Sequence, residues 1–186
     1  MDITRILEAD HRETEHVLGK ITRAKGDARR PLVASLNESL RKHMELEEKV
    51  VYPTVDRVVD HDEFVEGNTE HDLMRRVLND MMRLAPDQPG FGAKLAIVRA
   101  AVAHHVGDEE DDVFPVLRRH EPSLQELAKP FLDLRQSLGM PMPPAALAAA
   151  SSKGELAREA HAAGIERSSS MTKDELARAL VTVMSS

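Results

Sequence analysis

The sequence of 186 residues contains no cysteine and no tryptophan, one tyrosine and four phenylalanines. Without cysteine the chain can form neither a disulfide nor a thiolate metal site, so any metal must be held by histidine and carboxylate side chains. Because only 3% of the residues are aromatic, the apolar core must be built from leucine, valine, alanine and methionine. That composition favours helices over sheets.

Other absences concern partners and location. The net charge of −7 argues against a dominant nucleic-acid surface. The first residues carry no signal-peptide pattern, and there is no run of about 18 apolar residues that could span a membrane. We therefore expect a cytoplasmic location and no membrane partner. The length allows one good-sized domain and a small appendage.

The motif His-x3-Glu-Glu occurs twice, at residues 43–48 and 105–110. Each copy is followed by an aromatic-proline pair, Tyr52-Pro53 in the first and Phe114-Pro115 in the second. On an α-helix, residues four apart lie on the same face, so the histidine and the first glutamate of each copy can reach one point. Two such helices packed face to face would offer two nitrogens and two carboxylates to a pair of metal ions.

Apolar residues recur at helical spacing over four stretches, which we expect to form helices at about 4–25, 31–59, 62–84 and 93–119. The Pro- and Gly-rich residues 86–92 indicate a loop. Each helix places one histidine in its apolar stripe, and two of them add a glutamate four residues later. These inward residues are His11, His43, Glu47, His71, His105 and Glu109. The helical phase turns His16, His104 and the second glutamate of each motif outward.

A single buried histidine is more often a hydrogen-bonded core residue than a metal ligand. Two facing carboxylates in a core are harder to explain, because a buried carboxylate without a partner is strongly destabilising. No lysine or arginine points inward to neutralise Glu47 and Glu109; Arg75 lies at the edge of its stripe. Metal ions resolve this conflict, so we predict a dinuclear metal site inside a helical bundle. Most other carboxylates of the two motifs are expected on a solvated face, and Met74, Met81 and Met82 in the core.

The order of these residues resembles the hemerythrin HHE cation-binding family over about residues 1–120. The resemblance implies an all-α, up-down-up-down four-helix bundle that holds two iron ions joined by an oxo or hydroxo bridge. It also implies that His11, His43, His71 and His105 are the histidine ligands and that Glu47 and Glu109 are the bridging carboxylates. The family's oxygen carriers have His-x3-His on the third helix, whereas here Arg75 follows His71. One nitrogen ligand is missing, which argues against reversible oxygen carriage.

Two octahedral iron ions need about twelve ligand positions, of which these residues and a single-atom bridge would leave about two open. Two classes of function are then consistent with the site. One is an enzyme that decomposes hydrogen peroxide or a related small oxidant in a catalase-like reaction. The other is a non-catalytic protein that senses, carries or stores dioxygen, nitric oxide or iron. The open positions and the missing histidine favour the enzyme.

Tyr52 is the only tyrosine of the chain. On a straight helix it lies about 140° around from Glu47, which favours a packing residue that closes the end of the bundle. Pro53, however, removes a backbone donor, and a kink or single-turn bulge there would turn the phenol inward. Tyr52 would then fill an open position as a tyrosinate and act at the catalytic site.

The remainder of the chain predicts smaller elements. A helix at about 123–138 would cover the bundle, the Pro- and Ala-rich residues 141–150 indicate a linker, and two short helices follow at 153–163 and 172–184. We therefore expect a bundle domain over 1–140, a linker over 141–150 and a small module over 151–186. That module resembles the Rho-factor N-terminal and SAP-like helix–loop–helix modules, which implies contact with nucleic acid. Its five basic and five acidic side chains weaken attraction to phosphate and favour protein docking or tethering instead.

Overall fold

The structure of the chain, a computed structural model, describes residues 1–184 and contains no strand in that range. The predicted all-α class is confirmed. The chain divides into two compact units, one made of Asp10–Arg119 and the other of Met1–Ala9 with the chain from His120 onward. The boundary falls within the first helix, α1 (Thr4–Arg23). None of the helices within residues 1–184 is long and apolar enough to cross a membrane.

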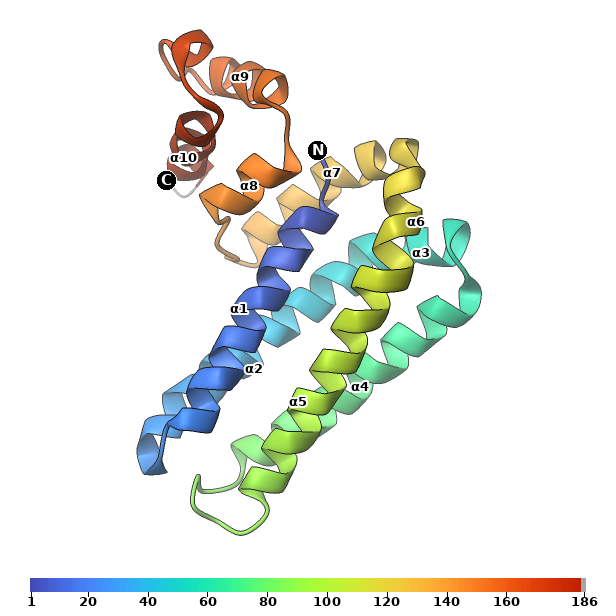
Figure 1. Cartoon of the computed structure of the whole chain (residues 1–186), viewed down its shortest axis with the longest axis vertical. Helices are drawn as coiled ribbons and strands as arrows, with labels where there is room; N and C mark the ends of the chain where they lie inside the picture. Colours follow the sequence, from blue (N-terminus) through green and yellow to red (C-terminus); the bar gives the residue numbers. More distant parts are fainter. Residues whose placement is uncertain (185–186) are drawn as a thin grey trace. The chain divides into compact units, whose positions relative to one another are not determined.

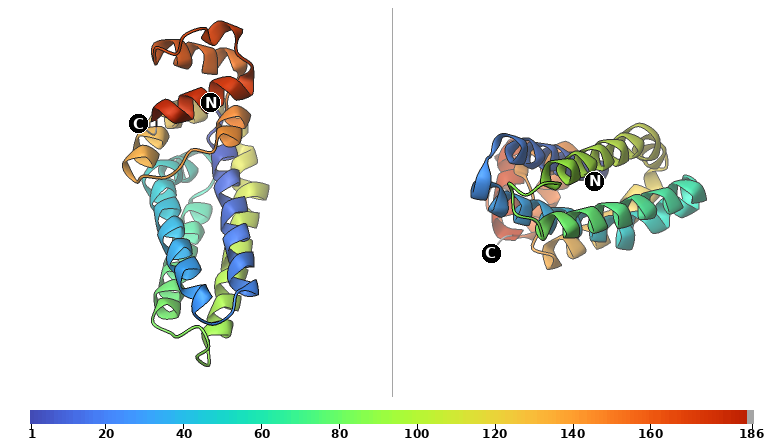
Figure 2. Two further views of the ribbon diagram at one scale, coloured as in Figure 1. Left: turned by 90° about the vertical axis from the view of Figure 1, so that its left-hand side faces the viewer. Right: turned by 90° about the horizontal axis from the view of Figure 1, so that it is seen from below.

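The larger unit is a four-helix bundle. Its long helices are α1 from Asp10 onward, α2 (Arg29–Leu46), α4 (His61–Met82) and α5 (Phe91–Asp108). Each of these helices runs opposite to the one before it, as Figure 1 shows. Figure 2 shows the same helices from two further sides. The up-down-up-down order expected from the sequence is therefore present.

Apolar side chains fill the part of the bundle nearest the α1–α2 and α4–α5 turns. This core comprises Val17, Leu18, Ile21, Val33, Leu36, Leu40, Met44, Met74, Leu78, Met81, Phe91, Leu95, Val98, Val102 and Val106. Met82, which we expected in the core, is 43% exposed because Leu78 and Met81 already occupy the inner face of α4. Burial of this apolar layer is the main contribution that holds the four helices together.

Each His-x3-Glu-Glu helix contains a π-helical turn that begins at the first glutamate of the motif. In the first, Glu47–Val51 (η2) separates α2 from α3 (Tyr52–Val58); in the second, Glu109–Val113 (η3) separates α5 from α6 (Phe114–Arg119). The backbone N–H of Tyr52 donates to the carbonyl of Glu47, five residues earlier, and Phe114 does the same to Glu109. The proline that follows each aromatic residue has no N–H for the next α-helical bond, so the local ladder is already interrupted there.

The smaller unit contains α7 (Glu121–Ser137), α8 (Pro144–Ala150), α9 (Lys153–Ala162), a short turn η4 (Ser168–Ser170) and α10 (Lys173–Met184). The expectation of a linker at 141–150 is corrected, since most of that segment is helix α8, which packs against α10. Alanine is the strongest helix former, and Pro144 is tolerated in the first turn. The backbone N–H of Asp2 donates to Ala150 O at 2.6 Å, and the Met1 ammonium lies 3.0 Å from Glu155 Oε1.

Candidate metal centre

The six residues predicted to face inward all lie together in the bundle. His11 comes from α1, His43 and Glu47 from α2 and its π turn, His71 from α4, and His105 and Glu109 from α5 and its π turn. Each of these six residues is at most 5% exposed. His16 and His104, which we expected to point outward, are exposed. Helical spacing therefore places the histidines and the first glutamates correctly.

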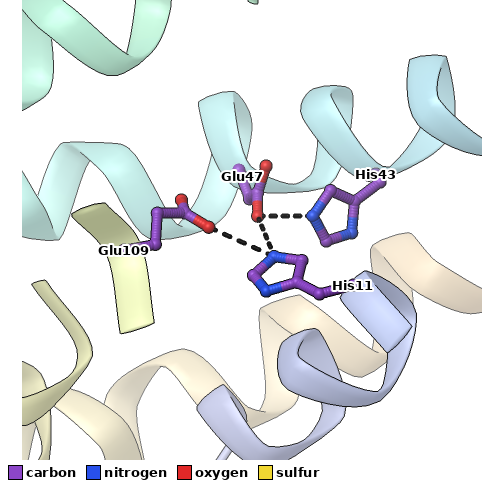
Figure 3. A group of neighbouring side chains, drawn as sticks. All are labelled: His11, His43, Glu47 and Glu109. Carbon is purple, nitrogen blue, oxygen red and sulfur yellow. Dashed lines mark ion pairs between the residues drawn. The ribbon is translucent and has the colours of Figure 1, made fainter. Parts of the chain in front are cut away.

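One half of the site is formed by His11 and His43 (Figure 3). Nε2 of His43 lies 2.8 Å from Glu47 Oε1, and Nε2 of His11 lies 4.0 Å from the same oxygen. Nε2 of His11 also lies 3.3 Å from Glu109 Oε2. His11, His43, Glu47 and Glu109 thus place one ligand atom each within 4.8 Å of one another.

The other half is formed by His71 and His105. Their Nε2 atoms are 3.1 Å apart, and Nε2 of His71 lies 3.3 Å from Glu47 Oε2. Nε2 of His105 lies 3.8 Å from Glu109 Oε2. Glu47 therefore turns one carboxylate oxygen to each pair of histidines, which is the arrangement that a carboxylate bridging two metal ions requires.

The chemistry of the buried atoms fits a metal better than a closed hydrogen-bond network. Among the described residues, the buried side-chain atoms that have no hydrogen-bond partner include Nε2 of His11 and of His43, both oxygens of Glu47, and Oε2 of Glu109. Leaving such groups without partners in a core is costly. Imidazole nitrogen and carboxylate oxygen are ligands that suit iron, and all of these orphaned atoms converge on one region.

Electrostatics of the metal-free arrangement point the same way. Burial alone would raise the pKa of Glu47, but His43, His11 and His71 outweigh it and hold that pKa well below its usual range. For His43 the directions are reversed: burial alone would lower its pKa, but Glu47 and Asp10 raise that pKa to about 9. The raised pKa of His43 favours a proton on its imidazole beside the Glu47 carboxylate when no metal is bound, and a bound metal would displace that proton.

The model of the hemerythrin HHE cation-binding domain matches residues 2–117, which is more than half of the chain. The chain belongs to the hemerythrin HHE family. The matched range contains all six residues of the candidate site, and the family's name describes a cation-binding domain.

A similar curated protein is one named DNA nickase from Nostoc sp. strain PCC 7120, which is 24% identical over 126 residues. The match spans 67% of this chain but only 36% of that protein. No solved structure matched the chain.

In this hemerythrin-like domain, two of the histidines donate hydrogen bonds from Nδ1, the ring nitrogen that faces away from the site, to carboxylates that we expected on a solvated face. Nδ1 of His71 donates to Glu48 Oε1 at 2.9 Å, and Nδ1 of His11 donates to Glu110 Oε1 at 2.8 Å. Glu48 and Glu110 are the second glutamates of the two motifs. Each points away from the core of its own helix and reaches a histidine on a neighbouring helix, so the expectation of a solvated role was wrong for these two residues.

The other two histidines have the same kind of support. Nδ1 of His105 donates to Glu70 Oε2 at 2.8 Å. Asp10 Oδ2 lies 3.6 Å from Nδ1 of His43, which is ion-pair rather than hydrogen-bond distance. Such partners fix the imidazole so that Nε2 faces the site and is free to bind a metal. The signal in the sequence was the acid that directly precedes His11 and His71, together with the second glutamate of each motif.

Two arginines complete this outer layer. Nη2 of Arg75 donates to Glu48 Oε1 at 2.6 Å, and Arg12 pairs with Glu110. Arg75, which replaces the second histidine of the oxygen carriers, therefore supports the site through Glu48 instead of entering it. The Arg75 and His71 partners hold the pKa of Glu48 below its usual value even though burial opposes this.

Tyr52 lies inside the site, whereas a straight helix would have turned its phenol away from Glu47. Its hydroxyl donates to Glu109 Oε1 at 3.2 Å and lies 3.3 Å from Nε2 of His71. Its ring stacks on that of His71, with centroids 5.2 Å apart and planes inclined by 14°. The π turn adds one residue to the helical turn after Glu47, and this rotates Tyr52 toward the core. Burial and the Glu109 carboxylate raise the pKa of Tyr52 well above its ordinary value.

Phe114 occupies the corresponding position in the other half. Its ring stacks on His11, with centroids 5.9 Å apart and planes inclined by 11°. Both aromatic residues thus follow a π turn and lie against the histidine of another helix. Only the tyrosine brings an oxygen atom.

A small cavity of about 10 Å³ adjoins Tyr52, His105 and Glu109. A void of that size holds about one water molecule. Its remaining lining residues are Val55, Glu63, Glu66, Gly67, Glu70, Asp108 and Val113. The approach to the site on this side is therefore narrow and acidic.

Proposed function

We propose that this hemerythrin-like domain holds two iron ions and decomposes hydrogen peroxide. His11 and His43 would hold one ion and His71 and His105 the other, with Glu47 and Glu109 between them. The observation that carries the proposal is the orientation of Glu47, whose two oxygens face different pairs of histidines. Bound iron would supply Lewis acidity and a reversible change of oxidation state.

Disproportionation of two peroxide molecules to two waters and one dioxygen needs no further reductant, so the domain would require no electron-transfer partner. The part played by the chain is to position and protect the site. Carboxylates behind the histidines fix their orientation, and the apolar layer of Leu40, Met44 and Val102 limits water on one side. The narrow acidic cavity limits access to small molecules on the other.

Tyr52 is the residue that we assign to an open ligand position. Its oxygen is within hydrogen-bond reach of His71 and Glu109, and the ligand set lacks the second histidine of the oxygen carriers. As a phenolate it would prevent dioxygen from binding reversibly at that position. This favours peroxide chemistry over oxygen carriage.

The main alternative is a non-catalytic protein that senses, carries or stores dioxygen, nitric oxide or iron. A cavity that holds about one water also suits diatomic ligands, which favours this alternative for dioxygen and nitric oxide. The nicking of DNA named for the Nostoc protein is not extended to this chain, because the match covers 36% of that protein and the chain carries a net charge of −7.

Metal analysis and oxygen evolution test the proposal. We expect about two iron ions per chain and release of dioxygen when peroxide is added to the purified protein. His105→Ala should lose both iron and activity, whereas His104→Ala, which alters the exposed neighbour, should keep both. A protein that holds two iron ions but evolves no dioxygen would support the binding alternative instead.

A further inference from the structure

Gly67 lies inside α4, one turn before His71, and is buried. A Cβ atom at this position would lie 2.6 Å from the Tyr52 hydroxyl oxygen, 2.8 Å from Cζ and 2.9 Å from Cε2. Real Cβ atoms do not approach other heavy atoms below 3.0 Å. All three of the nearest atoms belong to Tyr52, so no other contact explains the glycine.

The phenol has little freedom to move away. Its residue is only 2% exposed, its ring stacks on His71, and its hydroxyl donates to Glu109. On its other side the ring meets Phe64 edge-on, with centroids 6.5 Å apart. A rigid ring fixed at both ends cannot rotate aside as a flexible side chain would.

The backbone gives no other reason for glycine at residue 67. The glycines with positive φ are Gly26, Gly90, Gly139 and Gly164, and Gly67 is not among them. Glycine is also the poorest helix former after proline, so its position inside a helix needs a cause. Gly107, inside α5, has nothing within 4 Å of its ideal Cβ position. It therefore provides a matched control.

We propose that Gly67 is a positioning residue that admits the Tyr52 phenol to the His71/His105 half of the site. Any side chain at residue 67 would displace the phenol oxygen from His71 and Glu109. The assignment of that oxygen as a metal ligand rests on the proposed function, whereas the steric role of Gly67 does not. The two parts can be tested separately.

The steric part is tested with Gly67→Ala and Gly107→Ala in the full-length protein as purified. Tyr52 is the only tyrosine and the chain has no cysteine, so treatment with tetranitromethane followed by mass spectrometry reports on this one phenol. We expect the wild type and Gly107→Ala to resist nitration and Gly67→Ala to be nitrated. A Gly67→Ala protein that folds and resists nitration as the wild type does would overturn the proposal.

A second pair of variants covers the case in which Gly67→Ala does not fold. In a Tyr52→Leu background, which lacks the ring, Gly67→Ala should fold and leave the thermal midpoint unchanged or raised. If it destabilises that background as strongly as it destabilises the wild type, the added methyl group meets something other than the phenol and the proposal is wrong.

The optical spectrum separates this proposal from the proposed function. A visible band from iron-bound phenolate in the wild type should weaken in Gly67→Ala and persist in Gly107→Ala. A wild type that holds iron without such a band would refute ligation by Tyr52, while the nitration result would still decide the role of Gly67.

Discussion

The two halves of the site are built from the same parts. In each, an acidic residue and a histidine on one helix meet a His-x3-Glu-Glu motif on another, and a π turn begins at the first glutamate of that motif. They differ at the aromatic residue after the turn, which is Tyr52 beside His71 and Phe114 beside His11. The position four residues before the histidine also differs, with Gly67 in α4 and Leu7 in α1.

This difference shows how one backbone arrangement can serve two purposes. The shared parts, which are the inward histidines, the facing carboxylates and the outer acids, would hold metal in both halves. The phenol oxygen and the glycine beside it distinguish only the His71/His105 half. In the proposed function, a tyrosinate would therefore occupy a ligand position in that half alone.

The largest expected effect comes from removing a group that both halves share. Glu47→Ala should abolish iron binding in both halves, because each pair of histidines faces one oxygen of that carboxylate. The measurement is iron content per chain after purification. Glu45→Ala, on the same helix but paired with Lys49 outside the site, should retain iron. Retention of two iron ions by Glu47→Ala would show that the halves bind metal independently.

The next effect comes from making the two halves alike. Tyr52→Phe leaves an aromatic ring on His71, as Phe114 does on His11, but removes the oxygen. Iron content should stay at the wild-type level, while the visible band is lost and the rate of peroxide decomposition changes. The spectrum and the oxygen-evolution rate of the same iron-loaded samples provide the test. If both match those of the wild type, Tyr52 is a packing residue despite its position.

The six inward residues could be predicted from the sequence because the four histidines lie within α-helices and the two glutamates are the first residues of the π turns, before the extra residue shifts the helical phase. From His43 to Glu47, and from His105 to Glu109, the spacing of four residues places both side chains on the same face of the helix. Tyr52 could not be predicted in the same way. Pro53 indicated a disruption, but whether it produced an end, a kink or an inserted residue depends on the packing of the bundle. A single inserted residue decided which way the phenol points.

The supporting carboxylates were missed for a different reason. Helical periodicity predicts only whether a side chain lies on the apolar face of its own helix. Glu48 and Glu110 do point away from the apolar faces of their helices. What they meet depends on the neighbouring helix, which presents His71 to one and His11 to the other. The repetition of the second glutamate in both motifs was the available signal. The linker prediction failed because an Ala-rich segment forms helix readily once it can pack.

A smaller effect on metal binding is expected from variants of the outer carboxylates, and it should differ between the two halves. Glu48→Gln removes the carboxylate behind His71, and Glu110→Gln removes the one behind His11. Loss of such a partner typically weakens metal binding by about 10–100-fold. Glu48→Gln should weaken the His71 half and alter the visible band, whereas Glu110→Gln should weaken the other half and leave the band in place. Titration with a chelator, followed optically, distinguishes the two. Identical behaviour of both variants would show that the outer carboxylates act on the site as a whole.

The smallest expected effect is a gradual dependence on pH. The pKa of His43 in the metal-free protein is raised from 6.5 to about 9, because Glu47 and Asp10 outweigh its burial. A raised pKa contributes stability that is fully present below 6.5 and is lost as the pH rises through about 9.

The metal-loaded protein should respond in the opposite sense over this interval. Its histidines must be deprotonated to bind, so competition from protons weakens as the pH rises and metal binding strengthens. The thermal midpoints of the metal-free and metal-loaded protein should therefore diverge between pH 6.5 and pH 9. Calorimetry of both forms across that interval provides the measurement, and His16→Ala, altered at an exposed histidine of α1, should leave the divergence unchanged. A constant difference would mean that a proton on His43 does not balance Glu47 when metal is absent.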